Sequence, residues 1–532
     1  MGSVRRASPL LLLPLALSLG GCGKGTFTQA STAPADTLTY PLQAKNTTLD
    51  PGKVNDAYMA ELLQNVVEPL VIYNEKNTLV PWLAERWDVT DGGKTYIFHL
   101  RKGVKFSNGR PLVADDFRWT WERVLAPSFA SPAAGNYLLN IQGVPEYMAG
   151  KAKSISGVMA LDDATLRVTL DKPRPYFLGN LTVPTAAVMA KEAAGEKEAT
   201  TVEAVVGTGP FRLAKLVPDA ELDLDANSGY WGGKPGIAHV RRPIITDPAA
   251  RLARFLSGDL DYLELDRQSA QSLDKARREA GHLRYVTRPW LQFLVLGEKA
   301  YPAFKDARVR QALAMAIDRK RLVGQLLAGY DEAKGLVPHG VPGYQEDYKG
   351  LAFDPAKARS LLAQAGFPGG KGLPAIELDY TTSIAENRVI AESVATDLQK
   401  NLGVTVKPLL IEWGAYLDRQ DHGKLAMGTV GWSADYLDPQ NFTSMQVASF
   451  GPQDKEGFKD AQVDALCAQA DSDLDMKRRF DLYRRAEDRA VEQAARIPIF
   501  MMNQPIMTSS RLKRLPINAI GVMPLLHAEV GK

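Results

Sequence analysis

The side chains that could carry out hydrolysis do not fall into a catalytic pattern. The six histidines are scattered, without the HExxH spacing that lets two of them bind zinc from one helix face. No Gly-x-Ser-x-Gly sequence supplies a serine nucleophile on a strand-to-helix turn. The paired carboxylates Asp115-Asp116 and Asp162-Asp163 are adjacent, as in helix caps and turns. The sequence therefore predicts a protein that is not an enzyme and holds no metal or cofactor.

One cysteine has a position that indicates covalent modification. Residues 1–6 carry two arginines, and residues 10–19 are an apolar run too short to span a bilayer, which together are typical of a secretory signal. The four residues that end at Cys22 (Leu-Gly-Gly-Cys) resemble the lipobox of bacterial lipoproteins, where the thiol is acylated and becomes the mature N-terminus. We expect residues 1–21 to be removed and Cys22 to be lipidated. The alternative is an ordinary signal peptide with a chance cysteine.

The rest of the composition is that of a globular body on a tether. Residues 22–37, rich in Gly, Thr, Ser and Ala, predict a flexible lipidated tether. Cys467, the other cysteine, lies in an alanine-rich helical stretch and is predicted to be a buried free thiol. Lys and Arg number 64 against 61 acidic residues, a near-balance that argues against a nucleic-acid partner.

Periodicity predicts the elements that must position any site. Residues 94–100 and 165–170 alternate as half-buried strands, and Asp115-Asp116 begins a helix. The second half alternates helices with strand-like segments, which predicts βα units on a mixed sheet. The predicted helices there are 309–327, 355–365, 386–402 and 476–495.

Seven segments in order resemble the oligopeptide- and dipeptide-binding proteins of ABC importers, bacterial extracellular solute-binding protein family 5. They cover nearly the whole mature chain. The segments are TLDP (48–51), LAERWDVTDGGKTYIFHLRKGVKFSNGRPLVADDF (83–117), ISGVMALDDATLRVTL (155–170), VGTGPFRL (206–213), NSGYWGG (227–233), FKDARVRQALAMAIDR (304–319) and GWSADYLDP (431–439).

The resemblance implies an α/β fold of the two-lobed periplasmic-binding-protein kind (type II, cluster C-like), with an extra domain and hinge closure over a buried ligand. The hinge strands would lie near residues 290–292 and 501–504, since a few such residues can absorb domain closure. The implied parts are a base lobe of 38–67, 187–290 and 505–532, an extra domain of 68–186, and a second lobe of 291–504.

The resemblance also implies that an extended ligand lies between two backbone segments. These are residues 54–57, with Asn55 and Ala57, and residues 431–433, with Gly431 and Ser433. Main-chain hydrogen bonds would bind peptides regardless of sequence, and Gly431 would permit close approach.

Three side chains complete the implied site. Asp435 in GWSADY would pair with the α-ammonium of the ligand, because a buried charge needs a counter-charge. Trp432 would flank the ligand as an aromatic wall, the alternative being a core tryptophan. Tyr137 in the extra domain is a further candidate.

The partner of the ligand carboxylate departs from the family pattern. Thr429 stands where the oligopeptide carriers have an arginine, and Glu386 stands where a carboxylate-binding histidine is expected. Arg388, two residues further on, is the predicted substitute, unless the ligand carboxylate is solvated or absent.

These expectations combine into a function. We expect a monomeric, lipid-anchored protein of the periplasm or cell surface that captures short peptides and delivers them to ABC transporter permease subunits. The same fold could bind another solute, such as a murein peptide, nickel chelate, haem or sugar. A peptide-sensing receptor is the remaining alternative.

Overall fold

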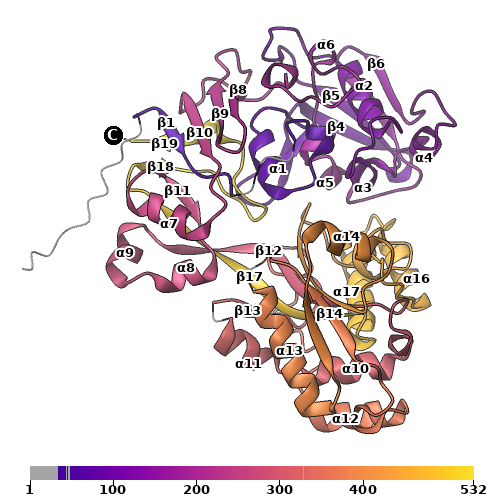
Figure 1. Cartoon of the computed structure of the whole chain (residues 1–532). Coiled ribbons are helices and arrows are strands. Elements are labelled where there is room, and N and C mark those ends of the chain that lie inside the picture. Colours follow the sequence, from indigo (N-terminus) through magenta and orange to yellow (C-terminus); the bar gives the residue numbers. More distant parts are fainter. Residues whose placement is uncertain are drawn as a thin grey trace, which may run out of the picture.

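The computed structural model describes residues 34–43, 45, 48–327, 329–382, 384 and 386–531. Within them the chain forms two bodies joined by the long crossing strands β12 (Arg284–Leu296) and β17 (Arg496–Thr508) (Figure 1). The two bodies confirm the predicted two-lobed α/β fold. The predicted signal peptide and Cys22 lie outside the described residues. Within the described ranges, no helix combines the length and apolar character needed to cross a membrane.

The first body contains a four-stranded sheet that places the start of the chain beside a later segment. Its order is β1 (Thr37–Thr39), β10 (His239–Pro243), β9 (Glu221–Ala226) and β8 (Phe211–Val217), with β1 and β10 parallel. The core beneath it collects apolar side chains from distant parts of the sequence, among them Leu62 of α1 (Ala57–Leu63), Val240 and Leu525. The described C-terminal segment is thereby fixed to the first body.

A second sheet in the same body belongs to the predicted extra domain. Its order is β4 (Ala84–Thr90), β5 (Thr95–Leu100), β7 (Thr165–Thr169) and β6 (Val158–Asp162), all antiparallel. The two strands expected at 94–100 and 165–170 are thus confirmed as β5 and β7. Helix α2 (Ala114–Leu125) begins at the expected place, where Asp116 Oδ2 accepts the Val113 N–H at 2.9 Å. This carboxylate therefore caps a helix.

The second body is built on the mixed sheet that the sequence predicts, and one edge strand of that sheet, β11 (Tyr262–Glu264), lies on the first body, where Tyr262 packs in the same core as Leu62 (Figure 1). The sheet order is β11-β17-β12-β16-β14-β15, and β14 runs parallel to both of its neighbours. The remaining strands are β11 (Tyr262–Glu264), β14 (Ile376–Tyr380), β15 (Val406–Leu410) and β16 (Met427–Ser433), with β13 (Asp331–Glu332) paired to β17. The main helices are α10 (Ala307–Ala316), α12 (Pro355–Gln364), α13 (Asn387–Leu402), α14 (Trp413–Asp421), α16 (Ala461–Ala470) and α17 (Met476–Glu492).

One predicted helix is wrong. The run 309–327 is not continuous, because Ile317 is extended (φ −91°, ψ 119°) and α10 ends at Ala316. The Asp318 side chain then accepts the Arg321 N–H at 2.9 Å and starts a new turn. A capping aspartate in the middle of the apolar pattern therefore breaks the helix.

The two faces of the central sheet are covered by different helices. Phe293 of β12 lies in the core that includes α16 and α17, whereas Leu294 lies in the core that includes α10, α12 and α13. Because side chains alternate along a strand, successive residues of β12 or of β16 point to opposite faces of the sheet and pack against different helices. The pairing of β12 with β17 is interrupted between Thr287 and Leu291, where the strands pass from one body to the other.

Candidate ligand-binding site

The carboxyl end of β16 forms the backbone part of the candidate site. In its pairing with β12, Gly431 lies opposite Gln292 and Ser433 lies opposite Trp290. A Cβ at Gly431 would lie 2.3 Å from Trp290 Cζ2 and 2.7 Å from Gln292 Oε1. A glycine is therefore required here to admit the indole and the amide of the neighbouring strand.

The predicted ammonium partner, Asp435, lies just beyond this strand end. Its Oδ2 accepts a hydrogen bond from Asn441 Nδ2 at 3.3 Å, and the Tyr137 phenol also hydrogen-bonds the carboxylate. Burial raises the pKa of Asp435 to about 6, while these two hydrogen bonds lower it. Desolvation therefore dominates, and an external cation at this carboxylate would be stabilised.

Asn441 is the residue of the site that sequence reasoning missed. It is fully buried, and its Oδ1 accepts both the Trp432 Nε1–H at 2.9 Å and the Asp435 backbone N–H at 3.3 Å. Its loop is braced by the buried ion pair of Asp438 with Arg479, at 2.7 Å. The available signal was its place in DPQN, directly after the GWSADYL segment. Asn441 thus orients the Trp432 indole and the Asp435 carboxylate together.

Tyr137 brings the other body to this carboxylate. It lies in α3 (Ala134–Leu138) and packs against the cores of both bodies. Burial, and then the adjacent Asp435, hold the pKa of Tyr137 well above its usual value, so the phenol remains a hydrogen-bond donor. The structure therefore brings three predicted site residues together, namely Tyr137, Trp432 and Asp435.

Further contacts join the two bodies beside Asp435. The Leu437 N–H donates to the Tyr73 hydroxyl at 3.1 Å, and both residues are buried. The rings of Tyr176 and Tyr436 stack with centroids 6.3 Å apart and an interplanar angle of 12°. Residues 73 and 176 belong to the first body and residues 436 and 437 to the second. The bodies are therefore in direct contact at this edge of the site.

The second predicted backbone segment is held on the first body. Asp50 begins this turn by accepting the Gly52 N–H at 2.9 Å, and it forms a buried ion pair with Arg123 of α2. Val54 then adopts an extended conformation (φ −63°, ψ 129°), followed by Asn55 and Ala57, which are both exposed. Asp56 is extended as well (φ −131°, ψ 150°), but Ala57 is the first residue of α1, so the stretch suited to strand addition ends at Asp56. Contact of Asn55 and Ala57 with a ligand stays a prediction.

The residues considered for the ligand carboxylate lie in different environments. Thr429 is buried, its carbonyl oxygen accepts the Tyr416 hydroxyl at 3.0 Å, and its Oγ1 has no partner among the described residues. Glu386 is buried and accepts the Tyr330 hydroxyl at 3.0 Å. Arg388 is 72% exposed and pairs with Glu392 at 2.8 Å. A carboxylate role for Arg388 would require this surface pair to open.

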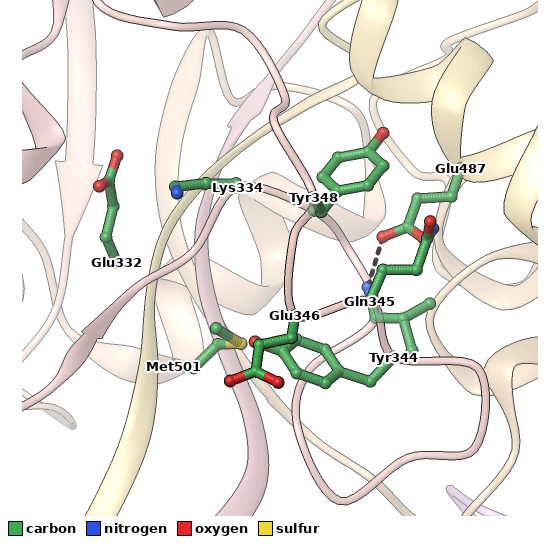
Figure 2. Close-up of a pocket in the computed structure, with 10 residues that line it drawn as sticks. Glu332, Lys334, Tyr344, Gln345, Glu346, Tyr348, Glu487 and Met501 are labelled. Atoms are coloured by element: carbon green, nitrogen blue, oxygen red, sulfur yellow. Dashed lines mark hydrogen bonds between the residues drawn. The ribbon is translucent and has the colours of Figure 1, made fainter.

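A separate hollow of about 50 Å³ lies within the second body (Figure 2). It is lined by residues of β13, the following loop, α17 and β17, and none of the predicted site residues lines it. Burial raises the pKa of Glu487 at its wall to about 7, and this carboxylate accepts the N–H groups of Leu336 and Val337 at 2.6 and 2.9 Å. Glu487 therefore fastens the loop over the hollow.

Two other expectations bear on the chemistry of the described residues. Cys467 is confirmed as a buried free thiol, and burial raises its pKa to about 12. Across the ranges given above, no group of three or more His, Cys, Asp or Glu side chains is arranged to hold a metal ion.

Comparison with known proteins gives consistent similarities in sequence. The family model for bacterial extracellular solute-binding proteins, family 5 Middle, matches residues 78–454. The probable deoxycholate-binding periplasmic protein YgiS of Escherichia coli is 32% identical over 490 residues, covering 89% of each chain. The dipeptide-binding protein DppE of Bacillus subtilis is 28% identical over 543 residues, covering 98% of each.

The same likeness appears in three dimensions. The murein tripeptide-binding protein MppA of Escherichia coli superposes with a TM-score of 0.82 at 28% identity, covering 94% of this chain and 99% of that one. The unliganded open form of MppA gives 0.75 with 94% and 98% covered. By this measure the chain is less similar to the open form than to the other MppA structure.

Proposed function

Because the chain belongs to the bacterial extracellular solute-binding proteins of family 5, we propose that it captures short peptides and delivers them to ABC transporter permease subunits. The observation that carries this proposal is the Asp435 carboxylate, oriented by Asn441 and facing Tyr137 of the other body. A desolvated carboxylate between two lobes is suited to the α-ammonium of a peptide. The extended backbone at 431–433 would pair with the peptide main chain.

The experiment is a thermal-shift panel on the purified chain. It compares di-, tri-, tetra- and pentapeptides with their N-acetylated forms, and adds deoxycholate and haem because relatives carry those names. A peptide at 100 times its Kd should add about 2.7 kcal/mol to stability. N-acetylation should abolish this gain, since it removes the ammonium. A shift with deoxycholate or haem, and with no peptide, would refute the peptide assignment.

Lipid anchoring at Cys22 is a further part of the proposal. Its support is the signal pattern of residues 1–21 and the Leu-Gly-Gly-Cys sequence. A diacylated Cys22 would hold the body at the outer face of a membrane, in the periplasm or on the cell surface. Cys22→Ser should release the protein into the soluble fraction, while Cys467→Ser should leave it membrane-bound. Unchanged membrane fractionation of Cys22→Ser would contradict the anchor.

A further inference from the structure

Three buried polar atoms on one face of the central sheet lack a hydrogen-bond partner among the described residues. They are Trp290 Nε1, Gln292 Oε1 and Thr429 Oγ1. Gln292 is 0% exposed and Thr429 is 5% exposed. Because buried polar atoms in proteins are nearly always paired, open atoms beside a candidate binding site point to a missing partner.

The strand register places these atoms around Gly431. Gln292 lies opposite Gly431 in the pairing of β12 with β16, and Thr429 is two residues before Gly431 on the same face. Gly431 has no side chain, so Trp290 Cζ2 and Gln292 Oε1 both come within 2.7 Å of the place a Cβ would occupy. We call these three side chains the Gln292 cluster.

A chain of amides fixes which atom Gln292 presents. Asn387 Nδ2 donates to the Thr381 carbonyl oxygen at 3.3 Å, and Gln292 Nε2 donates to Asn387 Oδ1 at 3.0 Å. A backbone carbonyl can only accept, so Asn387 must turn its nitrogen to Thr381 and its oxygen to Gln292. Gln292 must then turn its own nitrogen to Asn387. Its Oε1 is thereby held as an acceptor.

We propose that the Gln292 cluster binds an uncharged carboxamide of the ligand, so that the protein selects amides over carboxylates at this position. A carboxamide N–H would donate to Gln292 Oε1, while its oxygen would accept from the Trp290 indole or the Thr429 hydroxyl. A carboxylate has no hydrogen to offer Gln292 Oε1, and none of the three side chains is charged. The inference rests on the proposed function and adds the chemistry of the bound group.

Two sources of a carboxamide are possible in a peptide, an Asn or Gln side chain and an amidated C-terminus. Isothermal titration calorimetry on the purified chain would compare trialanine with tripeptides that carry Gln, Glu or Met at each position, and with trialanine amide. We expect Gln at one position, or the terminal amide, to bind at least about tenfold more tightly than its carboxylate counterpart, since unpaired buried groups discriminate strongly. The position of the gain identifies the source.

Two variants assign the selection to the cluster. Gln292→Glu should abolish the preference for the amide, whereas Gln364→Glu, on the exposed face of α12, should retain it. Thr429→Val keeps the side-chain volume and removes the hydroxyl, so it should weaken binding of the amide peptide and leave binding of its carboxylate counterpart unchanged. If Gln292→Glu does not fold, Thr429→Val provides the test in its place.

Equal binding of amide and carboxylate peptides at every position would overturn the inference and leave the proposed function standing. So would a preference for the amide that survives in Gln292→Glu. If no peptide binds the wild-type chain, the proposed function fails and this inference fails with it.

Discussion

Asn441 and Asp435 hold each other through two contacts. The side-chain amide nitrogen of Asn441 donates to Asp435 Oδ2 at 3.3 Å, and its carbonyl oxygen accepts the Asp435 backbone N–H at 3.3 Å. The same oxygen accepts the Trp432 indole N–H at 2.9 Å. One buried side chain thus orients both the predicted wall and the predicted counter-charge.

Replacing Asn441 should therefore impair peptide binding, although Asn441 is not itself predicted to contact the ligand. Asn441→Leu keeps a similar volume and leaves two N–H groups without an acceptor, at about 1–3 kcal/mol for each group that stays buried. We expect peptide affinity to fall at least about tenfold in calorimetry, because 1.4 kcal/mol is a factor of ten. Asn401→Leu removes a hydrogen bond to the Ala316 carbonyl elsewhere in the second body, so it should affect stability only. Equal affinity losses in both variants would argue against a specific role for Asn441.

Peptide binding should weaken in mild acid because of Asp435. Its pKa of about 6 means that only about a tenth of the carboxylate is charged at pH 5. The α-ammonium of a peptide stays protonated between pH 5 and 7, so affinity should fall about tenfold from pH 7 to pH 5. Asp435→Asn should bind weakly and lose this dependence. A wild-type Kd that is flat across the window would contradict the assignment.

The same group has the opposite effect on the stability of the ligand-free chain. Its folded pKa lies above that of an unfolded aspartate, about 3.9, so the folded state holds the proton more tightly. The contribution of Asp435 to stability is therefore full below pH 4 and declines as the pH rises through about 6. Glu487, whose pKa is about 7, also makes the free energy of unfolding depend on pH. Measuring the free energy of unfolding against pH for the wild type and for Asp435→Asn therefore separates the contribution of Asp435 from that of Glu487.

The Asp50–Arg123 ion pair should dominate the stability of the turn that begins residues 50–57. Both side chains are fully buried, and Asp50 Oδ2 also accepts the Ala199 N–H at 2.8 Å. Arg123→Met leaves the buried carboxylate without its counter-charge, which typically costs about 3–5 kcal/mol.

Arg118→Met is the matched control on the same helix. Arg118 is about one-third exposed and pairs with the exposed Asp115 and the half-buried Glu122, so it should contribute at most about 1 kcal/mol. Denaturant unfolding would measure both. If Arg123→Met and Arg118→Met lose similar amounts of unfolding free energy, burial of the Asp50–Arg123 pair does not increase its contribution to stability.

The sequence could predict those features that depend on local pattern or on an ordered set of motifs. Alternation predicted β5 and β7, and helical periodicity predicted α12, α13 and α17 to within a few residues. Trp432 and Asp435 were placed by the GWSADY motif, and the structure brings both against Asn441. These features depend on residues that are close together in the sequence, so tertiary packing does not change where they occur.

What the sequence could not predict depends on contacts between distant residues. The pairing of Asn387 with Gln292 joins positions 95 residues apart, and neither side chain stands in a recognisable motif. Arg388 is on the same helix as Asn387, and a linear reading favoured it because it is charged. The helix turns Asn387 inward and leaves Arg388 exposed. Which of the two side chains faces the interior depends on how α13 is packed. Sequence spacing predicts this poorly for the first residues of a helix.

Closure of the two bodies should respond to a single hydroxyl. Tyr73 of the first body accepts the Leu437 N–H of the second at 3.1 Å in a buried contact. Tyr73→Phe removes that acceptor. The Leu437 N–H then lacks a partner when the bodies meet, whereas water can satisfy it when they separate. The penalty of about 1–3 kcal/mol therefore falls on the closed arrangement alone.

The expected result is a shift toward an open form and weaker peptide binding, by about fivefold to a hundredfold, since a ligand that binds the closed form must pull that equilibrium back. Small-angle scattering would show a larger radius of gyration for ligand-free Tyr73→Phe, and calorimetry would measure the affinity. Tyr301→Phe is the matched control, because Tyr301 donates to the Pro374 carbonyl at 2.7 Å within the second body and should change stability alone. If Tyr73→Phe keeps both the radius and the affinity of the wild type, the contact between Tyr73 and Leu437 does not govern closure.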